Sequence, residues 1–139
     1  MLSLYTSGSK YSRRRCSSVV NWFCTKYLPK HKIEVEVLHR GLLREGVYGW
    51  CTITDCAWRP RSFLIELHNR MSCEDYIITL LHELQHILQH VRGDLKDKGQ
   101  KRLWKGIDCS GLDYEDQPWE QEAHKLEKIL YQDYLTSCS

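Results

Sequence analysis

The sequence lacks the features of several specialised classes of protein. It contains no run of about 18 apolar residues, so it predicts no membrane-spanning helix and no membrane partner. It also has no internal repeat, no low-complexity tract, and no hydrophobic leader followed by a small-residue cleavage site. The composition, 42% hydrophobic and 27% charged over 139 residues, is typical of one soluble globular domain. We therefore predict a single domain over residues 1–139, with residues 1–9 disordered.

No pair of cysteines has the C-x-x-C spacing of a zinc ribbon or zinc knuckle. The seven cysteines are an odd number and lie at positions 16, 24, 51, 56, 73, 109 and 138. This pattern favours buried, reduced thiols in a cytoplasmic protein over a disulfide framework. A bridge between Cys51 and Cys56 is the less favoured alternative.

Acidic residues are absent from the first 33 positions, which contain seven Lys or Arg, among them Arg13, Arg14 and Arg15. A basic face of this kind is either a solvated helix surface or a contact for nucleic acid. An acid-poor, Arg-rich start also resembles a transit peptide. Because Val19 and Phe23 continue the segment at helical spacing, we expect it to belong to the fold.

The first half of the chain predicts one helix followed by three strands. Residues 10–28 are amphipathic at helical spacing, and Pro29 ends the helix because it cannot donate the next hydrogen bond. Apolar and polar residues alternate over 33–38, and residues 47–54 and 62–68 are rich in aromatic and β-branched or other apolar side chains. The order predicts an α+β fold with a short, mainly antiparallel three-stranded sheet.

The second half predicts two helices separated by a long loop. Ser72 and Asp75 are spaced to cap the start of a helix that runs to about Val91. Residues 94–117 are rich in Lys, Asp and Gly, which is typical of a long surface loop of functional or mobile character. Pro118 is suited to the first position of the final helix.

The central helix contains the motif His82-Glu83-Leu84-Gln85-His86, which matches H-E-x-x-H. A spacing of four residues places both imidazoles on one face of a helix, one turn apart, where they can bind one zinc ion. Glu83 then acts as the general base rather than as a ligand. A chance match on a surface helix is the alternative, and the apolar residues around the motif argue against it.

A catalytic zinc ion needs a third protein ligand. The metzincin continuation is absent, because Gln89 and Arg92 occupy the positions of its glycine and its last histidine. His90 is too close in sequence to bend back to the metal, so we expect it to be a polar residue of the last helical turn.

The segment after Pro118 offers three further ligands. Glu120 and Glu122 point about 200° apart on a helix, so only one of them can face the metal. We favour Glu120, because Ala123 lies on its side of the helix and permits close packing. Glu122 is the alternative third ligand, and His124 is a third choice or a supporting residue.

These motifs resemble the SprT-like and minigluzincin group of small zinc metallopeptidases, especially compact members from phage genomes. The resemblance covers nearly the whole chain and rests on the His82–His86 motif, the preceding order of elements, and the Pro118–Ala123 segment. It implies a zincin-like fold with one catalytic zinc ion held by His82, His86 and a glutamate. Two features depart from the group: the chain has no zinc ribbon, and it lacks the third-ligand histidine of the Spartan branch.

The resemblance therefore predicts a zinc-dependent peptidase that acts on a protein or peptide substrate in the cytoplasm of a microbe or a phage-infected cell. An edge strand, formed by residues 47–54 or 62–68, would bind the substrate. Tyr114 and His124 are the predicted donors to the oxyanion. Two alternatives stay open: a zinc hydrolase that cleaves a non-protein amide, and an inactive module in which zinc only stabilises the fold.

Overall fold

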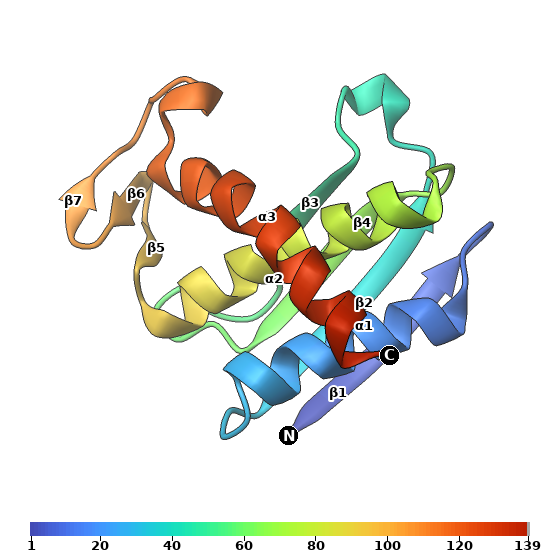
Figure 1. Cartoon of the computed structure of the whole chain (residues 1–139). Coiled ribbons are helices and arrows are strands. Elements are labelled where there is room, and N and C mark those ends of the chain that lie inside the picture. Colours follow the sequence, from blue (N-terminus) through green and yellow to red (C-terminus); the bar gives the residue numbers. More distant parts are fainter. Residues whose placement is uncertain (139) are drawn as a thin grey trace.

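The computed structural model describes residues 1–138 and shows an α+β protein with three helices and two sheets (Figure 1). The helices are α1 (Arg13–Tyr27), α2 (Cys73–Arg92) and α3 (Pro118–Ser137). The larger sheet contains β1 (Leu2–Gly8), β2 (Ile33–Arg40), β3 (Gly49–Ile53) and β4 (Ser62–His68). The smaller sheet contains β5 (Leu95–Lys98), β6 (Lys101–Trp104) and β7 (Ile107–Asp108). The predicted α+β class is confirmed.

The larger sheet is mixed, with the strand order β1-β2-β4-β3. β1, β2 and β4 are parallel, and only β3 is antiparallel to its neighbour. The prediction of a mainly antiparallel, three-stranded sheet is therefore wrong. It failed for two reasons: β1, which pairs in parallel with β2, was missed, and β4 inserts between β2 and β3, so that β2 and β4 also pair in parallel.

The prediction of disorder over residues 1–9 is wrong for Leu2–Gly8, which form β1 at one edge of the sheet. Leu2 pairs with Ile33 and Gly8 pairs with His39, so the strand is in register along its whole length. Leu2 and Leu4 pack partly buried against the core. The alternation is short, because the small residues Thr6, Ser7 and Gly8 follow the two leucines.

The core lies between the larger sheet and the helices. α1 and α2 contact the same sheet, and α3 packs across α2 on the side away from it (Figure 1). The interior of the core consists of apolar residues from α1, β2, β4 and α2, among them Val20, Phe23, Val37, Ile65, Leu80 and Leu84. This arrangement buries α2 between the sheet and α3, so any polar side chain on it needs a partner.

The segment 94–117 was predicted to be a loop without regular structure, and this is also wrong. It folds into the antiparallel strands β5, β6 and β7, followed by a short 3-10 helix, η2 (Tyr114–Asp116). The Arg102 guanidinium lies 5.3 Å from the Trp119 ring and also bonds Asp97. These contacts fix the small sheet against the start of α3.

All seven cysteines are free, as predicted, and Cys51 and Cys56 form no bridge. Only Cys16 and Cys24 are buried, so the expectation of buried thiols holds for two of the seven. Arg13 and Arg14 are exposed at the start of α1, and their contact with nucleic acid stays a prediction. Among residues 1–138, no helix combines the length and the apolar character that crossing a bilayer requires.

Gly8 provides a test of the β1 pairing. Its φ is +106°, and a Cβ atom at this position would lie 2.0 Å from the main-chain oxygen of His39. We expect Gly8→Ala to lower the free energy of unfolding by at least about 2 kcal/mol, measured by urea denaturation. Gly41→Ala is the control, because nothing lies within 4 Å of its Cβ position. Equal stability of the two variants would contradict the close approach of β1 and β2.

Candidate metal centre

The polar residues of the candidate site lie on α2, whose local sequence explains its position. The Ser72 hydroxyl accepts a hydrogen bond from the Asp75 N–H, as predicted, and caps the start of the helix. Every residue from Leu80 to His90 is buried. His82 and His86 are each 7% exposed, so α2 holds two imidazoles inside the protein.

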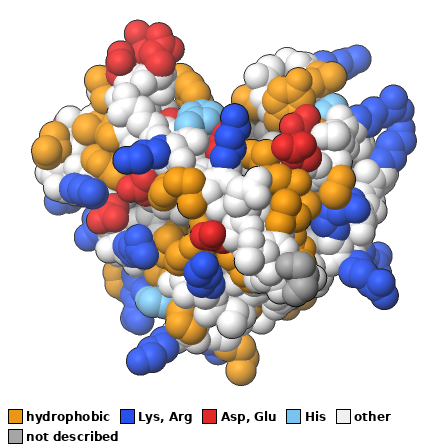
Figure 2. Space-filling model, in the orientation of Figure 1, with side chains coloured by type: hydrophobic (Ala, Val, Ile, Leu, Met, Phe, Trp, Pro, Cys, Tyr) orange, Lys and Arg blue, Asp and Glu red, His pale blue; other side chains and the backbone are white. Residues whose placement is uncertain are grey.

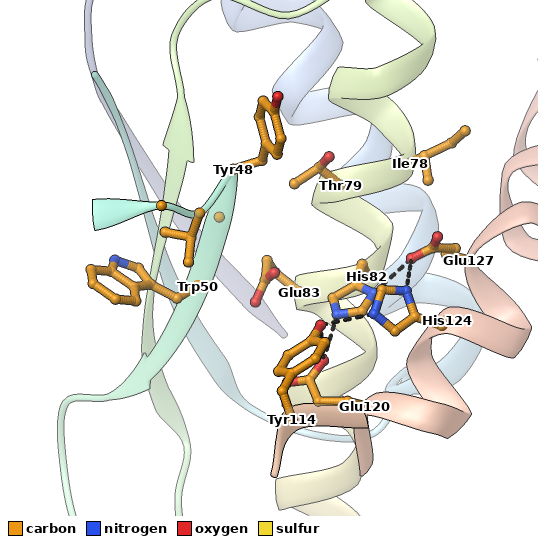
Figure 3. Close-up of a pocket in the computed structure, with 13 residues that line it drawn as sticks. Tyr48, Trp50, Ile78, Thr79, His82, Glu83, Tyr114, Glu120, His124 and Glu127 are labelled. Atoms are coloured by element: carbon orange, nitrogen blue, oxygen red, sulfur yellow. Dashed lines mark hydrogen bonds and ion pairs between the residues drawn. The ribbon is translucent and has the colours of Figure 1, made fainter. Parts of the chain in front are cut away.

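The structure brings His82, His86 and Glu120 together. Oε1 of Glu120 lies 2.9 Å from Nε2 of His82 (Figure 3). The same oxygen lies 3.1 Å from Nε2 of His86. Each residue can offer one ligand atom, and the three atoms lie within 4.8 Å of one another. Two imidazole nitrogens and one carboxylate oxygen are a donor set that suits zinc.

The other ring nitrogen of each histidine, Nδ1, is hydrogen-bonded to a further side chain. Nδ1 of His82 lies 2.7 Å from Oε2 of Glu127, and Nδ1 of His86 lies 2.8 Å from Oε1 of Gln89. A carboxylate or amide oxygen accepts a hydrogen bond from the Nδ1–H group, so that a neutral ring, the form that binds a metal, has its lone pair on Nε2. Both rings therefore present Nε2 to the Glu120 carboxylate.

Glu122, the alternative third ligand, lies in a different environment. Its Oε1 accepts hydrogen bonds from the side-chain amides of Gln85, at 2.9 Å, and Gln89, at 3.0 Å. The Gln89 amide also donates to the main-chain oxygen of Trp119. Glu122 thus joins α3 to α2, and the geometry favours Glu120 as the residue that completes the donor set.

The charges of the site depend on one another. Burial by itself would lower the pKa of His82, but hydrogen bonds to Glu120 and Glu127 raise it to about 10. Burial would likewise raise the pKa of Glu120, but hydrogen bonds from His82 and His86 hold it well below its usual range. The Glu120 carboxylate is therefore ionised at neutral pH and suited to a cation.

Glu83 differs from the other carboxylates of the site in its burial and its contacts. It is 5% exposed, and its side chain has no hydrogen-bond partner among residues 1–138. Figure 3 shows it directed from α2 towards β3, away from Glu120. Burial raises its pKa, and the nearby His86 and His82 oppose this rise. A buried carboxylate that is free to accept a proton has the character of a general base.

Tyr114 and His124 lie beside the donor set, as Figure 3 shows. The Tyr114 hydroxyl is 3.1 Å from Oε1 of Glu120 and 2.8 Å from Nε2 of His124. Burial and the Glu120 carboxylate raise the pKa of Tyr114, so its hydroxyl keeps its proton. His82, His124 and Glu127 form a second group of ligand atoms. That group would use Nδ1 of His82 and the exposed His124, so it is the weaker metal site.

These residues line a cavity of about 480 Å³ between β3, α2 and α3. Val47, Tyr48 and Gly49 form one wall, and Tyr114 and Glu120 form the opposite wall. Figure 2 shows the hollow in the surface at the top of the view, beside a histidine side chain. Two members of the donor set, His82 and Glu120, are therefore reached from solvent through a groove that follows β3.

Sequence reasoning missed Glu127, Gln85 and Gln89 as parts of the site. Glu127 lies seven residues, or about two helical turns, after Glu120, so their shared face was a signal. The two glutamines are polar residues on an otherwise buried helix, which also predicts partners. His90 does not take part in the site: it is buried, and its Nδ1 lies 3.2 Å from the Leu95 oxygen.

Comparison of the chain with protein-family models, with curated proteins and with solved structures finds no match. The function must therefore be argued from the residues and their arrangement.

Proposed function

We propose that this protein is a zinc-dependent peptidase with a zincin-like fold, similar to the SprT-like and minigluzincin group. The observation that carries the proposal is the position of the Glu120 oxygen, within 3.1 Å of Nε2 of both histidines of the H-E-x-x-H motif. The unpaired, buried Glu83 beside them supports catalysis rather than a purely structural site.

His82, His86 and Glu120 would hold the zinc ion. When bound, zinc polarises the scissile carbonyl and lowers the pKa of the attacking water. Glu83 removes a proton from that water as its oxygen bonds to the carbonyl carbon. Glu83 then passes the proton to the leaving nitrogen as the C–N bond breaks. Tyr114 and His124 donate hydrogen bonds to the oxyanion that forms on the carbonyl oxygen.

The edge of the sheet supports a peptide as the substrate. β3 is the last strand of the sheet and follows the groove. The Thr54 N–H donates a hydrogen bond to the Ser62 oxygen. In an antiparallel pair the hydrogen-bonded positions alternate, so the main-chain groups of the even-numbered residues of β3 form hydrogen bonds with β4. The main-chain groups of Gly49, Cys51 and Ile53 therefore face the open edge. An extended peptide can bind there as a further strand, whereas a small non-protein amide would use none of these groups.

The test is hydrolysis by the zinc-loaded protein of a mixture of denatured proteins, followed by mass spectrometry of the new termini. We expect one zinc ion per chain and cleavage that stops with a chelator and returns when zinc is restored. Zinc binding without cleavage would leave the zinc-stabilised module as the better hypothesis. Protein without bound zinc after incubation with zinc would overturn the proposal.

Gln89 provides a test of how the second histidine is positioned. We expect Gln89→Leu to weaken zinc binding by about 10- to 100-fold, because His86 loses the acceptor that orients its ring. Affinity is measured by competition with a chromophoric chelator. Gln85→Leu is the matched control, since the Gln85 amide also donates to Glu122 but, among residues 1–138, forms no hydrogen bond to either histidine ring. Equal weakening by both changes would assign the effect to the Glu122 contact instead.

A further inference from the structure

A second cavity lies further along β3 than the candidate metal centre. Residues 46–50 line the first cavity, and Cys51, Thr52 and Ile53 line the next one along β3. This second cavity has a volume of about 370 Å³, and its other walls include His90 of α2. A peptide bound along β3 would therefore pass from one cavity to the other.

His90 presents a hydrogen-bond acceptor to this second cavity. It is 6% exposed, and Nδ1 lies 3.2 Å from the Leu95 main-chain oxygen, so Nδ1 carries a proton. Nε2 has no hydrogen-bond partner among residues 1–138. Burial lowers the pKa of His90 to about 4, so the ring is neutral at pH 7 and Nε2 presents a lone pair. An unpaired acceptor that lines a cavity can take a hydrogen bond from a ligand that enters the cavity.

The charged groups around His90 favour a cationic donor. Asp55 and Asp97 line the cavity with carboxylates, and Arg102 is the one guanidinium among the lining residues. Arg102 is bound to Asp97 through two contacts, at 2.7 Å and 3.1 Å. Among the described residues 1–138, the Asp55 carboxylate accepts a hydrogen bond only from the Arg61 main-chain N–H. The charges of the lining thus leave one negative charge in excess.

The direction of β3 determines which part of a peptide reaches this cavity. Antiparallel pairing is slightly more stable per residue than parallel pairing. A peptide antiparallel to β3 runs from Ile53 towards Gly49, and so passes His90 before it reaches Glu83. The residue that enters the second cavity therefore precedes the scissile bond.

We propose that the cavity between β3 and His90 is a subsite for a lysine or arginine side chain that precedes the scissile bond. Nε2 of His90 accepts a hydrogen bond from the cation, and the Asp55 and Asp97 carboxylates attract its charge. This inference rests on the proposed peptidase function, whose substrate class it names.

The first experiment compares peptides that carry arginine or norleucine at each of the three positions before one cleaved bond. We expect wild-type protein to prefer arginine at one position by about tenfold in kcat/KM, as for a hydrogen bond to a charged group. His90→Phe should abolish the preference while the norleucine peptide is cleaved as before. His31→Phe is the matched control, because His31 lies outside the groove.

The second experiment separates this inference from the proposed function. The same peptides are titrated by calorimetry into the Glu83→Gln protein, where binding is measured without hydrolysis. About tenfold tighter binding of the arginine peptide, lost in Glu83→Gln/His90→Phe, supports the subsite even if wild-type protein cleaves nothing. Asp97→Asn should also reduce the preference for the arginine peptide. It is the substitute variant if His90→Phe does not fold. Equal binding of both peptides would overturn the subsite.

Discussion

Glu83→Gln is expected to lower the kcat of peptide hydrolysis by about 10²- to 10⁴-fold while zinc remains bound. The amide has nearly the shape of the carboxylate but cannot take a proton from water. Glu83 has no hydrogen-bond partner among residues 1–138, so the change breaks no such bond in the fold. The measurement is kcat on a peptide that the wild-type protein cleaves, with zinc content determined on the same samples.

Glu74→Gln is the matched control, because Glu74 is exposed in the first turn of the same helix. It should leave kcat unchanged. Unchanged hydrolysis in Glu83→Gln would show that another group is the base. Loss of both the fold and the zinc ion would instead give Glu83 a structural role, and the enzyme hypothesis would lose its main support.

Glu120→Ala is expected to remove stoichiometric zinc, as His86→Ala should, whereas Glu122→Ala should retain one zinc ion per chain. The reason is geometric: Glu120 reaches both imidazoles, and Glu122 reaches only the amides of Gln85 and Gln89. Metal content is measured by mass spectrometry after dialysis against zinc-free buffer.

The stability of Glu122→Ala is a second measurement on the same variant, and it shows whether the substitution has removed the contacts of Glu122. Removing it leaves two amide donors short of an acceptor, so we expect a loss of about 1–3 kcal/mol in the free energy of unfolding. Loss of zinc in Glu122→Ala together with its retention in Glu120→Ala would show that Glu122, and not Glu120, is the third zinc ligand. It would also mean that α3 turns on its axis when the metal binds.

The elements that sequence reasoning predicted are those with strong local signals. α2 combines a Ser72 cap with a sustained apolar period, and Pro118 indicated the start of α3. The strands that it missed depend on partners distant in the sequence: β1 is stable because it pairs with β2, and β5 because it pairs with β6. Pairing of this kind leaves little trace in a single short segment.

The site shows the same division. A motif of five residues was enough to indicate His82, Glu83 and His86, because helical spacing fixes their shared face. The choice between Glu120 and Glu122 depended on how α3 turns against α2, which the sequence left open. Glu127 and Gln89 were missed because their role exists only through contact with the histidine rings.

The contact between His86 and Glu120 has a consequence for the stability of the folded chain. The two residues are 34 positions apart, and the segment between them contains the whole of the smaller sheet. A metal ion held by both ends would close this segment into a ring. Because the site exists only in the folded chain, the free energy of metal binding would add to the stability of the folded state. A bound ion would therefore hold α3 against α2. Its removal would destabilise the smaller sheet before the larger one.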